Sequence, residues 1–204
     1  MSTSSSIIEE IKALCDAGLG LMAYYYFDFT DTAKQDVRGL VSSLVVQLSA
    51  KSDLCYDILS DLYSKHGAGS QSPHDDVLTQ CLKDMLELPG QPPNYIIIDA
   101  LDECPYFFGA PSPRELVLDL IKDLVALHLP NLRICLTSRP EADIQEPHGP
   151  LVSHSVSLHD EARQKQDILN YIRSAVQSDR KMRTWSTEDR ELVIDTLSRR
   201  ADGM

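Results

Sequence analysis

One stretch of the chain decides its fold: Asn94-Tyr-Ile-Ile-Ile-Asp99-Ala-Leu-Asp102-Glu103-Cys-Pro105. Its apolar run has strong β propensity and fits a strand that is buried on both faces, as strands of parallel sheets are. Pro92 and Pro93 prevent a helix from running into the stretch from upstream. The sequence therefore predicts a central parallel strand over residues 94–98.

Three acids, Asp99, Asp102 and Glu103, directly follow this predicted strand. Open α/β sheets bind their ligands beyond the carboxyl ends of the strands. One carboxylate there can hold Mg²⁺ through oxygen, and a second, a short step beyond, can polarise an attacking water. The alternative is a strand that ends in a solvated acidic turn, and the residues alone leave both interpretations open.

Composition limits the classes of protein that fit. The chain has 204 residues and a net charge of −12, and an acidic body is a poor match for nucleic acid, which is bound by neutralising phosphates. Its five cysteines are scattered without a Cys-x-x-Cys pair, which suits reduced thiols and a cytoplasmic location. No run of apolar residues is long enough for a transmembrane helix, so we expect no membrane partner.

Strands and helices alternate along the sequence. Besides 94–98, runs with β propensity predict strands over 21–27, 132–137 and 153–158. Apolar residues at helical spacing predict helices over about 4–17, 37–48, 54–62, 77–86, 112–129, 160–176 and 187–200. This order indicates an α/β fold, a three-layer parallel sheet with helices on both faces. We expect this core to span residues 1–158 and a helical tail to span 159–204.

Two of the helices have more detailed predictions. Ser112, Pro113 and Glu115 form a capping box with proline in the first turn, so a helix is expected to start there. This helix is expected to bury Leu116 together with Leu120, Ile121, Leu124 and Val125. The last helix is expected to bury Leu192, Val193 and Leu197.

Two motifs carry a resemblance to a known family. Asp99-Ala-Leu-Asp-Glu-Cys104 and Leu136-Thr-Ser-Arg-Pro140, each at the end of a predicted strand, resemble the corresponding motifs of fungal NACHT domains. These domains are STAND-class P-loop NTPases of the NOD-like receptor and heterokaryon-incompatibility type. The stretch Tyr25-Tyr-Phe-Asp-Phe29 and the closing Arg200-Ala-Asp-Gly-Met204 are also similar to that family, so the resemblance covers nearly the whole chain.

The resemblance implies a role for each matched residue. Asp99 would be the Mg²⁺-associated acid of the Walker B motif, and Asp102 and Glu103 would be the catalytic acids that activate water. Arg139 would bind the γ-phosphate, because a guanidinium fork matches phosphate oxygens, and Thr137 and Ser138 would bind beside it. The alternatives are a surface arginine in a turn for Arg139 and a structural turn for its two neighbours.

The departure from the family is large, because the sequence contains no G-x-x-x-x-G-K-[ST] phosphate loop. The chain thus resembles a fragment or degenerate form of a NACHT signalling NTPase without its first strand and phosphate loop. The complete family uses Mg²⁺ with ATP or GTP to switch an oligomerisation platform, and we expect little nucleotide binding by this chain alone. Two alternatives stay open: a nucleotide-independent protein-interaction module, and an ATPase completed in trans by a partner that supplies the loop.

The missing strand has a further consequence for the sheet. Strands 21–27, 94–98 and 132–137 are expected to pair in parallel with 94–98 in the middle, and 153–158 to be detached. The outer edge of 132–137 would then be unpaired, which predicts protein partners or self-association into a homo-oligomer through strand addition.

Overall fold

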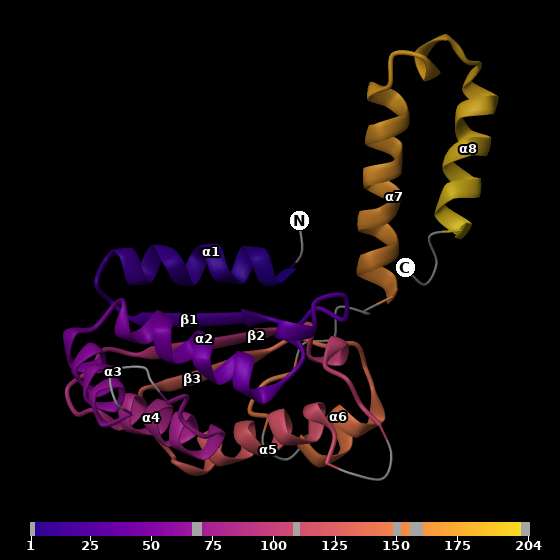
Figure 1. Cartoon of the computed structure of the whole chain (residues 1–204). Helices are drawn as coiled ribbons and strands as arrows, with labels where there is room; N and C mark the ends of the chain where they lie inside the picture. The colour runs from indigo at the N-terminus through magenta and orange to yellow at the C-terminus, as the bar shows by residue number, and fades with distance from the viewer. Residues whose placement is uncertain (1–2, 67–70, 108–110, 149–151, 156–160, 201–204) are drawn as a thin grey trace. The chain divides into compact units, whose positions relative to one another are not determined.

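The structure is a computed structural model, and it describes residues 3–66, 71–107, 111–148, 152–155 and 161–200 (Figure 1). The chain divides into two compact units, Met1–Val152 and Ser153–Met204. The sequence-based prediction placed this division after residue 158. Unit 1 holds the sheet and the acidic motif, so the fold of that unit positions the candidate site.

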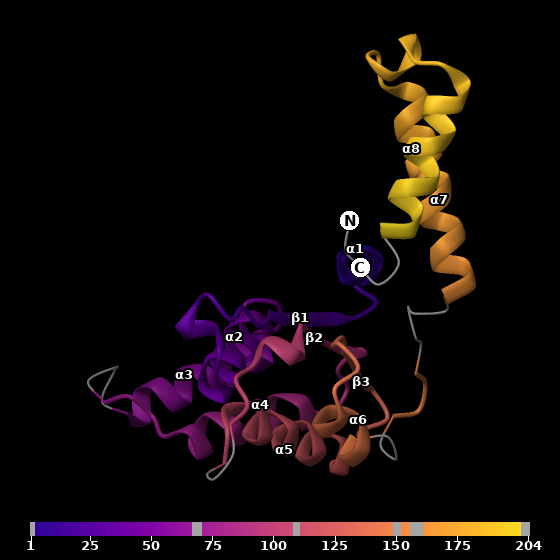
Figure 2. The same cartoon turned by 90° about the vertical axis from the view of Figure 1, so that its right-hand side faces the viewer.

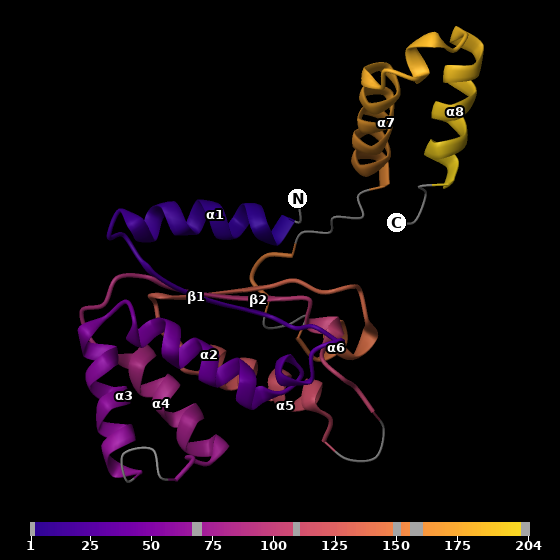
Figure 3. The same cartoon turned by 45° about the horizontal axis from the view of Figure 1, so that its top comes forward.

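Unit 1 is built around a parallel sheet in the order β1-β2-β3. Its strands are β1 (Leu21–Tyr26), β2 (Asn94–Asp99) and β3 (Leu132–Leu136). In the register, Tyr26 lies opposite Asp99, and Ile98 lies opposite Leu136. The carboxyl ends of all three strands therefore meet at one end of the sheet, as Figure 3 allows the reader to follow.

One face of the sheet carries the main hydrophobic core. Ile96 and Ile98 of β2 point into it and are almost completely buried. The helices packed on this face are α2 (Val37–Ser49), α3 (Asp53–Lys65), α4 (Asp75–Glu87), α5 (Pro113–Ala126) and the short α6 (Ala142–His148). α2 begins at Asp36, whose side chain caps it, and α5 begins with the predicted capping box of Ser112 and Glu115.

The opposite face of the sheet is covered by a single described helix, α1 (Thr3–Asp16), so the unit has three layers (Figures 1 and 2). α1 turns the half-buried side chains of Ile8, Ile11 and Cys15 to one side. Met22 and Ile97 are buried on this face, whereas Tyr24 and Tyr26 stay more than one-third exposed. The second face is thus less completely buried than the first.

Unit 2 is a helical hairpin of α7 (Glu161–Ser178) and α8 (Thr187–Arg200), which lie side by side (Figure 1). Its small core consists of Ile172, Val176 and Ile194, with partly buried apolar neighbours. The helical tail predicted from the sequence is therefore present as a hairpin with a core of its own.

The structure confirms the predicted α/β class, the parallel pairing and the central place of residues 94–98. It differs at the fourth strand, since residues 153–155 form no strand, while 156–158 lie outside the described residues. In α5 the predicted residues Leu120, Ile121 and Leu124 are buried, but Leu116 is 45% exposed. In α8 Leu192 and Leu197 were predicted to be buried but are exposed, and Ile194 is buried instead. None of the described helices is both long and apolar enough to cross a membrane.

Candidate functional site

The site begins where β2 ends, because the backbone turns sharply at one residue. Ala100 adopts the left-handed conformation with φ 55° and ψ 46°. A short 3₁₀ turn, η2 (Leu101–Glu103), follows it, and Leu101 is buried beneath the turn. Asp102 and Glu103 therefore lie in this turn, beyond the end of β2.

Asp99 is held by the residue that follows β3. The Thr137 hydroxyl donates a hydrogen bond to Asp99 Oδ1, and the same hydroxyl oxygen accepts from the Ala100 N–H at 3.1 Å. The backbone continues the pairing, since Thr137 N donates to Ile98 O at 3.0 Å and Leu101 N donates to Thr137 O at 3.0 Å. Asp99 and Thr137 thus form one hydrogen-bonded unit across the ends of two neighbouring strands.

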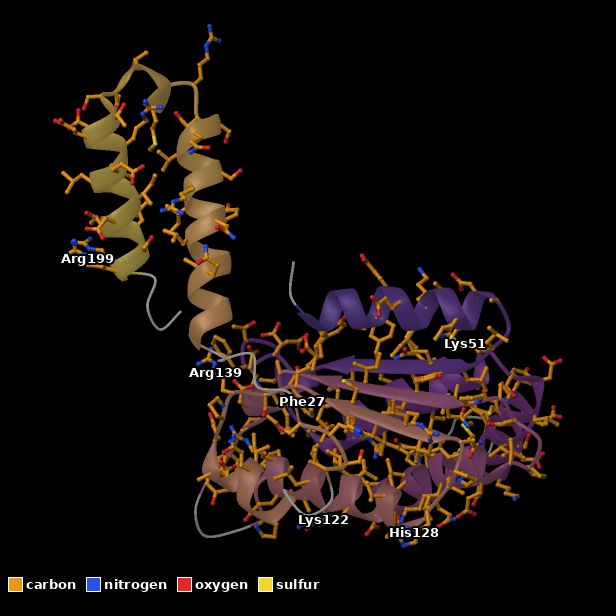
Figure 4. The ribbon with its side chains drawn as sticks, turned by 180° about the vertical axis from the view of Figure 1, so that it is seen from behind. Phe27, Lys51, Lys122, His128, Arg139 and Arg199 are labelled. Carbon is orange, nitrogen blue, oxygen red and sulfur yellow. The ribbon has the colours of Figure 1, made fainter. Side chains whose placement is uncertain are left out.

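Asp102 is paired with Arg139. Its Oδ1 accepts from the Arg139 backbone N–H at 3.0 Å, and its Oδ2 lies 3.3 Å from Arg139 Nε. The Asp102 side chain is only 10% exposed, whereas that of Arg139 is 80% exposed. The carboxylate is therefore sheltered, while most of the guanidinium faces solvent at the carboxyl end of the sheet, near Phe27 in Figure 4.

Glu103 contacts the loop that follows β1 rather than β3. Its Oε2 accepts a hydrogen bond from the Phe29 N–H at 3.2 Å. Gln35 holds the same loop, since its Nε2 donates to Phe29 O at 2.7 Å. In this arrangement Glu103 has a structural contact that links the ends of β1 and β2.

A cleft of about 350 Å³ lies between these loops and is lined by Phe29, Gln35, Asp102, Glu103, Cys104, Pro105, Arg114, Arg139 and Glu141. Cys104 is fully buried at its base, and its thiol donates to Gln35 O at 3.4 Å. Burial raises the pKa of the Cys104 thiol to about 12, with a smaller opposing effect of Arg114. The thiol therefore stays protonated at neutral pH and is not a nucleophile.

Asp99 acts electrostatically on the other face of the sheet. The pKa of Cys135 is raised by burial and then by the nearby Asp99 carboxylate. Burial and the same carboxylate also raise the pKa of Tyr26. Because Asp99 does not line the cleft, the predicted site residues form two groups.

The first group is Asp99 with Thr137, and the second is Asp102, Glu103 and Arg139 around the cleft. Ser138 lies between them and is exposed, and no hydrogen bond of its side chain is found within the described parts of the chain. Those same parts contain no cluster of three or more His, Cys, Asp or Glu side chains that could hold a metal ion.

The sequence analysis missed Arg114, which contacts both sides of the cleft. It is the second residue of α5, only 5% exposed, and it donates to Cys104 O at 2.9 Å and to Asp102 O at 2.6 Å. It also pairs with Glu141 and Asp143 beyond β3. The one available signal was an arginine in the first turn of a helix beginning beside the acidic motif.

Comparison with models of known protein families identifies the family of the chain. The model of the family described as nephrocystin 3, N-terminal, matches residues 2–139, which hold all of the sheet, the acidic motif and the second motif as far as Arg139. The chain belongs to the nephrocystin 3 N-terminal family. This N-terminal domain is found in NACHT-like and NTPase-associated proteins. No curated protein and no solved structure matches the chain.

Proposed function

We propose that this chain carries the acid and arginine part of the nucleotide site of a NACHT-like signalling NTPase, and that alone it binds nucleotide weakly. The observation that carries the proposal is the Asp102–Arg139 pair, with Asp99–Thr137 beside it, at the carboxyl end of a parallel sheet. Ligands of open α/β sheets bind at that end. Membership of a family found in NACHT-like proteins supports the same fold class, that of P-loop NTPases.

Arg139 is the residue best suited to contact a phosphate. Its side chain is 80% exposed although Nε lies beside Asp102, so its outer N–H groups can reach an anion. A planar fork of N–H groups matches phosphate oxygens in a bidentate manner. Arg139 therefore has the chemistry to bind the terminal phosphate of ATP or GTP, with Asp102 holding its backbone in place.

The expected weakness of binding follows from the groups that the sequence lacks. A phosphate loop provides a cradle of backbone N–H groups, a lysine and a hydroxyl for Mg²⁺, and no stretch of this sequence has that pattern. The carboxylates present are engaged by protein groups, as Asp99 is by Thr137 and Glu103 is by Phe29. For the complete site we propose the family's role, a nucleotide-dependent switch of oligomerisation, in the cytoplasm, where the five free cysteines would remain reduced.

An NMR titration of the ¹⁵N-labelled chain with Mg²⁺ and ATP tests the proposal. We expect saturable shifts of the Thr137, Ser138 and Arg139 amides with a Kd of about 1 mM or weaker, worth roughly 4 kcal/mol. Arg139→Ala should abolish the shifts. Arg133→Ala, at an exposed arginine within β3, is the control that should leave them unchanged.

The second candidate is an interaction module that works without nucleotide. This candidate is favoured by the hydrogen bonds within the chain that already engage the carboxylates of Asp99, Asp102 and Glu103. An absence of shifts up to about 10 mM ATP, or shifts that persist in Arg139→Ala, would reject the nucleotide site and support this module. ATP turnover that disappears in Glu103→Gln would contradict both and indicate an active enzyme.

A further inference from the structure

Arg114 lies in the first turn of α5, between the two strand-end motifs. The capping box of Ser112 and Glu115 fixes the start of this helix, and Arg114 N donates to Pro105 O at 3.1 Å. The side chain is 7% exposed. A buried guanidinium needs partners for its five N–H donors, and the contacts it makes show what it holds together.

Two of its donors hold the acidic turn. Arg114 Nε donates to Cys104 O at 2.9 Å, and Nη2 donates to Asp102 O at 2.6 Å. These two carbonyl groups stand on either side of Glu103. The guanidinium therefore fixes the backbone that carries both acids, without contacting either carboxylate.

The remaining contacts hold the segment after β3. Arg114 Nη1 pairs with Glu141 and with Asp143 Oδ2, the latter at 3.0 Å. Glu141 N donates to Arg139 O at 2.9 Å, so this carboxylate belongs to the turn that carries Arg139. Burial lowers the pKa of Arg114, but the hydrogen bonds to Glu141 and Asp143 outweigh burial, and the net pKa is raised.

We infer that Arg114 is the positioning residue of this site, because it holds the acidic turn and the Arg139 turn together so that Asp102 pairs with Arg139. The function of that pair rests on the function proposed above, whereas the positioning can be tested in the chain alone. A lysine keeps the charge but is a point donor without a planar fork. It cannot hold two carbonyl groups and two carboxylates in fixed directions.

Amide hydrogen exchange of the full chain, followed by NMR, tests the inference. The readouts are the Arg139 N–H, which donates to Asp102, and the Phe29 N–H, which donates to Glu103. In Arg114→Lys both should exchange about tenfold faster through local opening, while the amides of Ile97 and Ile98 keep their rates. Arg38→Lys is the matched control, because Arg38 also bridges a carbonyl and a carboxylate, Pro73 O and Asp75, away from the site.

Unchanged exchange of Arg139 in Arg114→Lys, or the same acceleration in Arg38→Lys, would overturn the inference. Should Arg114→Lys not fold, the double variant Glu141→Gln with Asp143→Asn removes only the carboxylates beyond β3. In this double variant the Arg139 N–H should exchange about tenfold faster, and the exchange rate of the Phe29 N–H should stay unchanged. An unaltered exchange rate of the Arg139 N–H would reject the positioning role. If the wild type does not respond to ATP, the proposed function fails, but these rates still decide the role of Arg114.

Discussion

Ala100 is the residue on which the geometry of the acidic turn depends. A residue with a Cβ pays about 1–2 kcal/mol in the left-handed region that Ala100 occupies. The hydrogen bond from its N–H to the Thr137 hydroxyl offsets part of that cost. Strained backbone of this kind persists where the surroundings over-determine it, and here the strained residue stands between Asp99 and the turn that carries Asp102 and Glu103.

Cys104 makes the stability of the protein decrease as the pH becomes alkaline. Its pKa is raised from 9.0 to about 12 in the folded chain by burial. Above pH 9 the unfolded thiol loses its proton while the folded thiol keeps it, so rising pH favours unfolding. We predict a decline in the free energy of unfolding from about pH 9 upward, measured by urea denaturation at a series of pH values.

The decline should be shallower in Cys104→Ala when each variant is compared with its own value at pH 7. Comparing each variant with its own value at pH 7 cancels the packing energy that is lost when the Cys104 sulfur is removed. Cys81, whose pKa burial raises to about 11, remains in the variant, so part of the decline should persist. Identical slopes in wild type and Cys104→Ala would show that this thiol is not buried in solution.

At the scale of elements, the outer edge of β1 is protected by α2. The amide of Gln47 both accepts from Tyr24 N at 3.1 Å and donates to Tyr24 O at 2.7 Å. Lys51, from the residues that follow α2, donates to Met22 O. These side chains replace the backbone partners that a neighbouring strand would provide.

We therefore predict that Gln47→Ala lowers the free energy of unfolding by about 1–3 kcal/mol, because it removes two hydrogen bonds to the edge of β1, each worth about 0.5–1.5 kcal/mol. Urea denaturation measures the change. Gln80→Ala on α4 is the control, since Gln80 is exposed and pairs only with Asp84 within its own helix. It should cost less than about 0.5 kcal/mol, and equal costs for the two variants would reject the edge-protecting role.

For the whole molecule, the two edges of the sheet differ. Thr137 N bonds to Ile98 O and Asn94 N bonds to Asn131 O, so alternate residues of β3 turn their backbone groups toward β2. The residues between them, Ile134 and Leu136, turn theirs outward, and no described segment pairs with that edge. This contrasts with β1, whose edge is covered by side chains.

We predict that the chain associates with itself as its concentration rises, through strand addition at the edge of β3. Size-exclusion chromatography over a range of concentrations measures this. Cys135→Lys places a charge on the edge strand and should shift the chain toward monomer. A strictly monomeric wild type at every concentration would mean that the edge is closed in solution.

The sequence by itself determined the architecture of unit 1. The apolar run before Asp99 was correctly predicted to be a buried strand, and the capping box at Ser112 to begin a helix, because both signals are local and depend on neighbouring residues. The motifs at Asp99 and Arg139 could be placed at the same end of the sheet, since parallel strands align their carboxyl ends.

Only the tertiary structure decided which side chains meet there. In α5 the apolar residues form one broad face with Leu116 at its margin, and the packing against the sheet and its neighbours decided that Leu116 is exposed while Val117 is buried. The turn that follows Asp99 contains one left-handed residue, and the role of Arg114 depends on carbonyl groups and carboxylates from two other segments. Such contacts join residues that are distant in the sequence. They form, and stabilise the site, only once α5 has packed on the sheet. A local sequence pattern therefore cannot predict them.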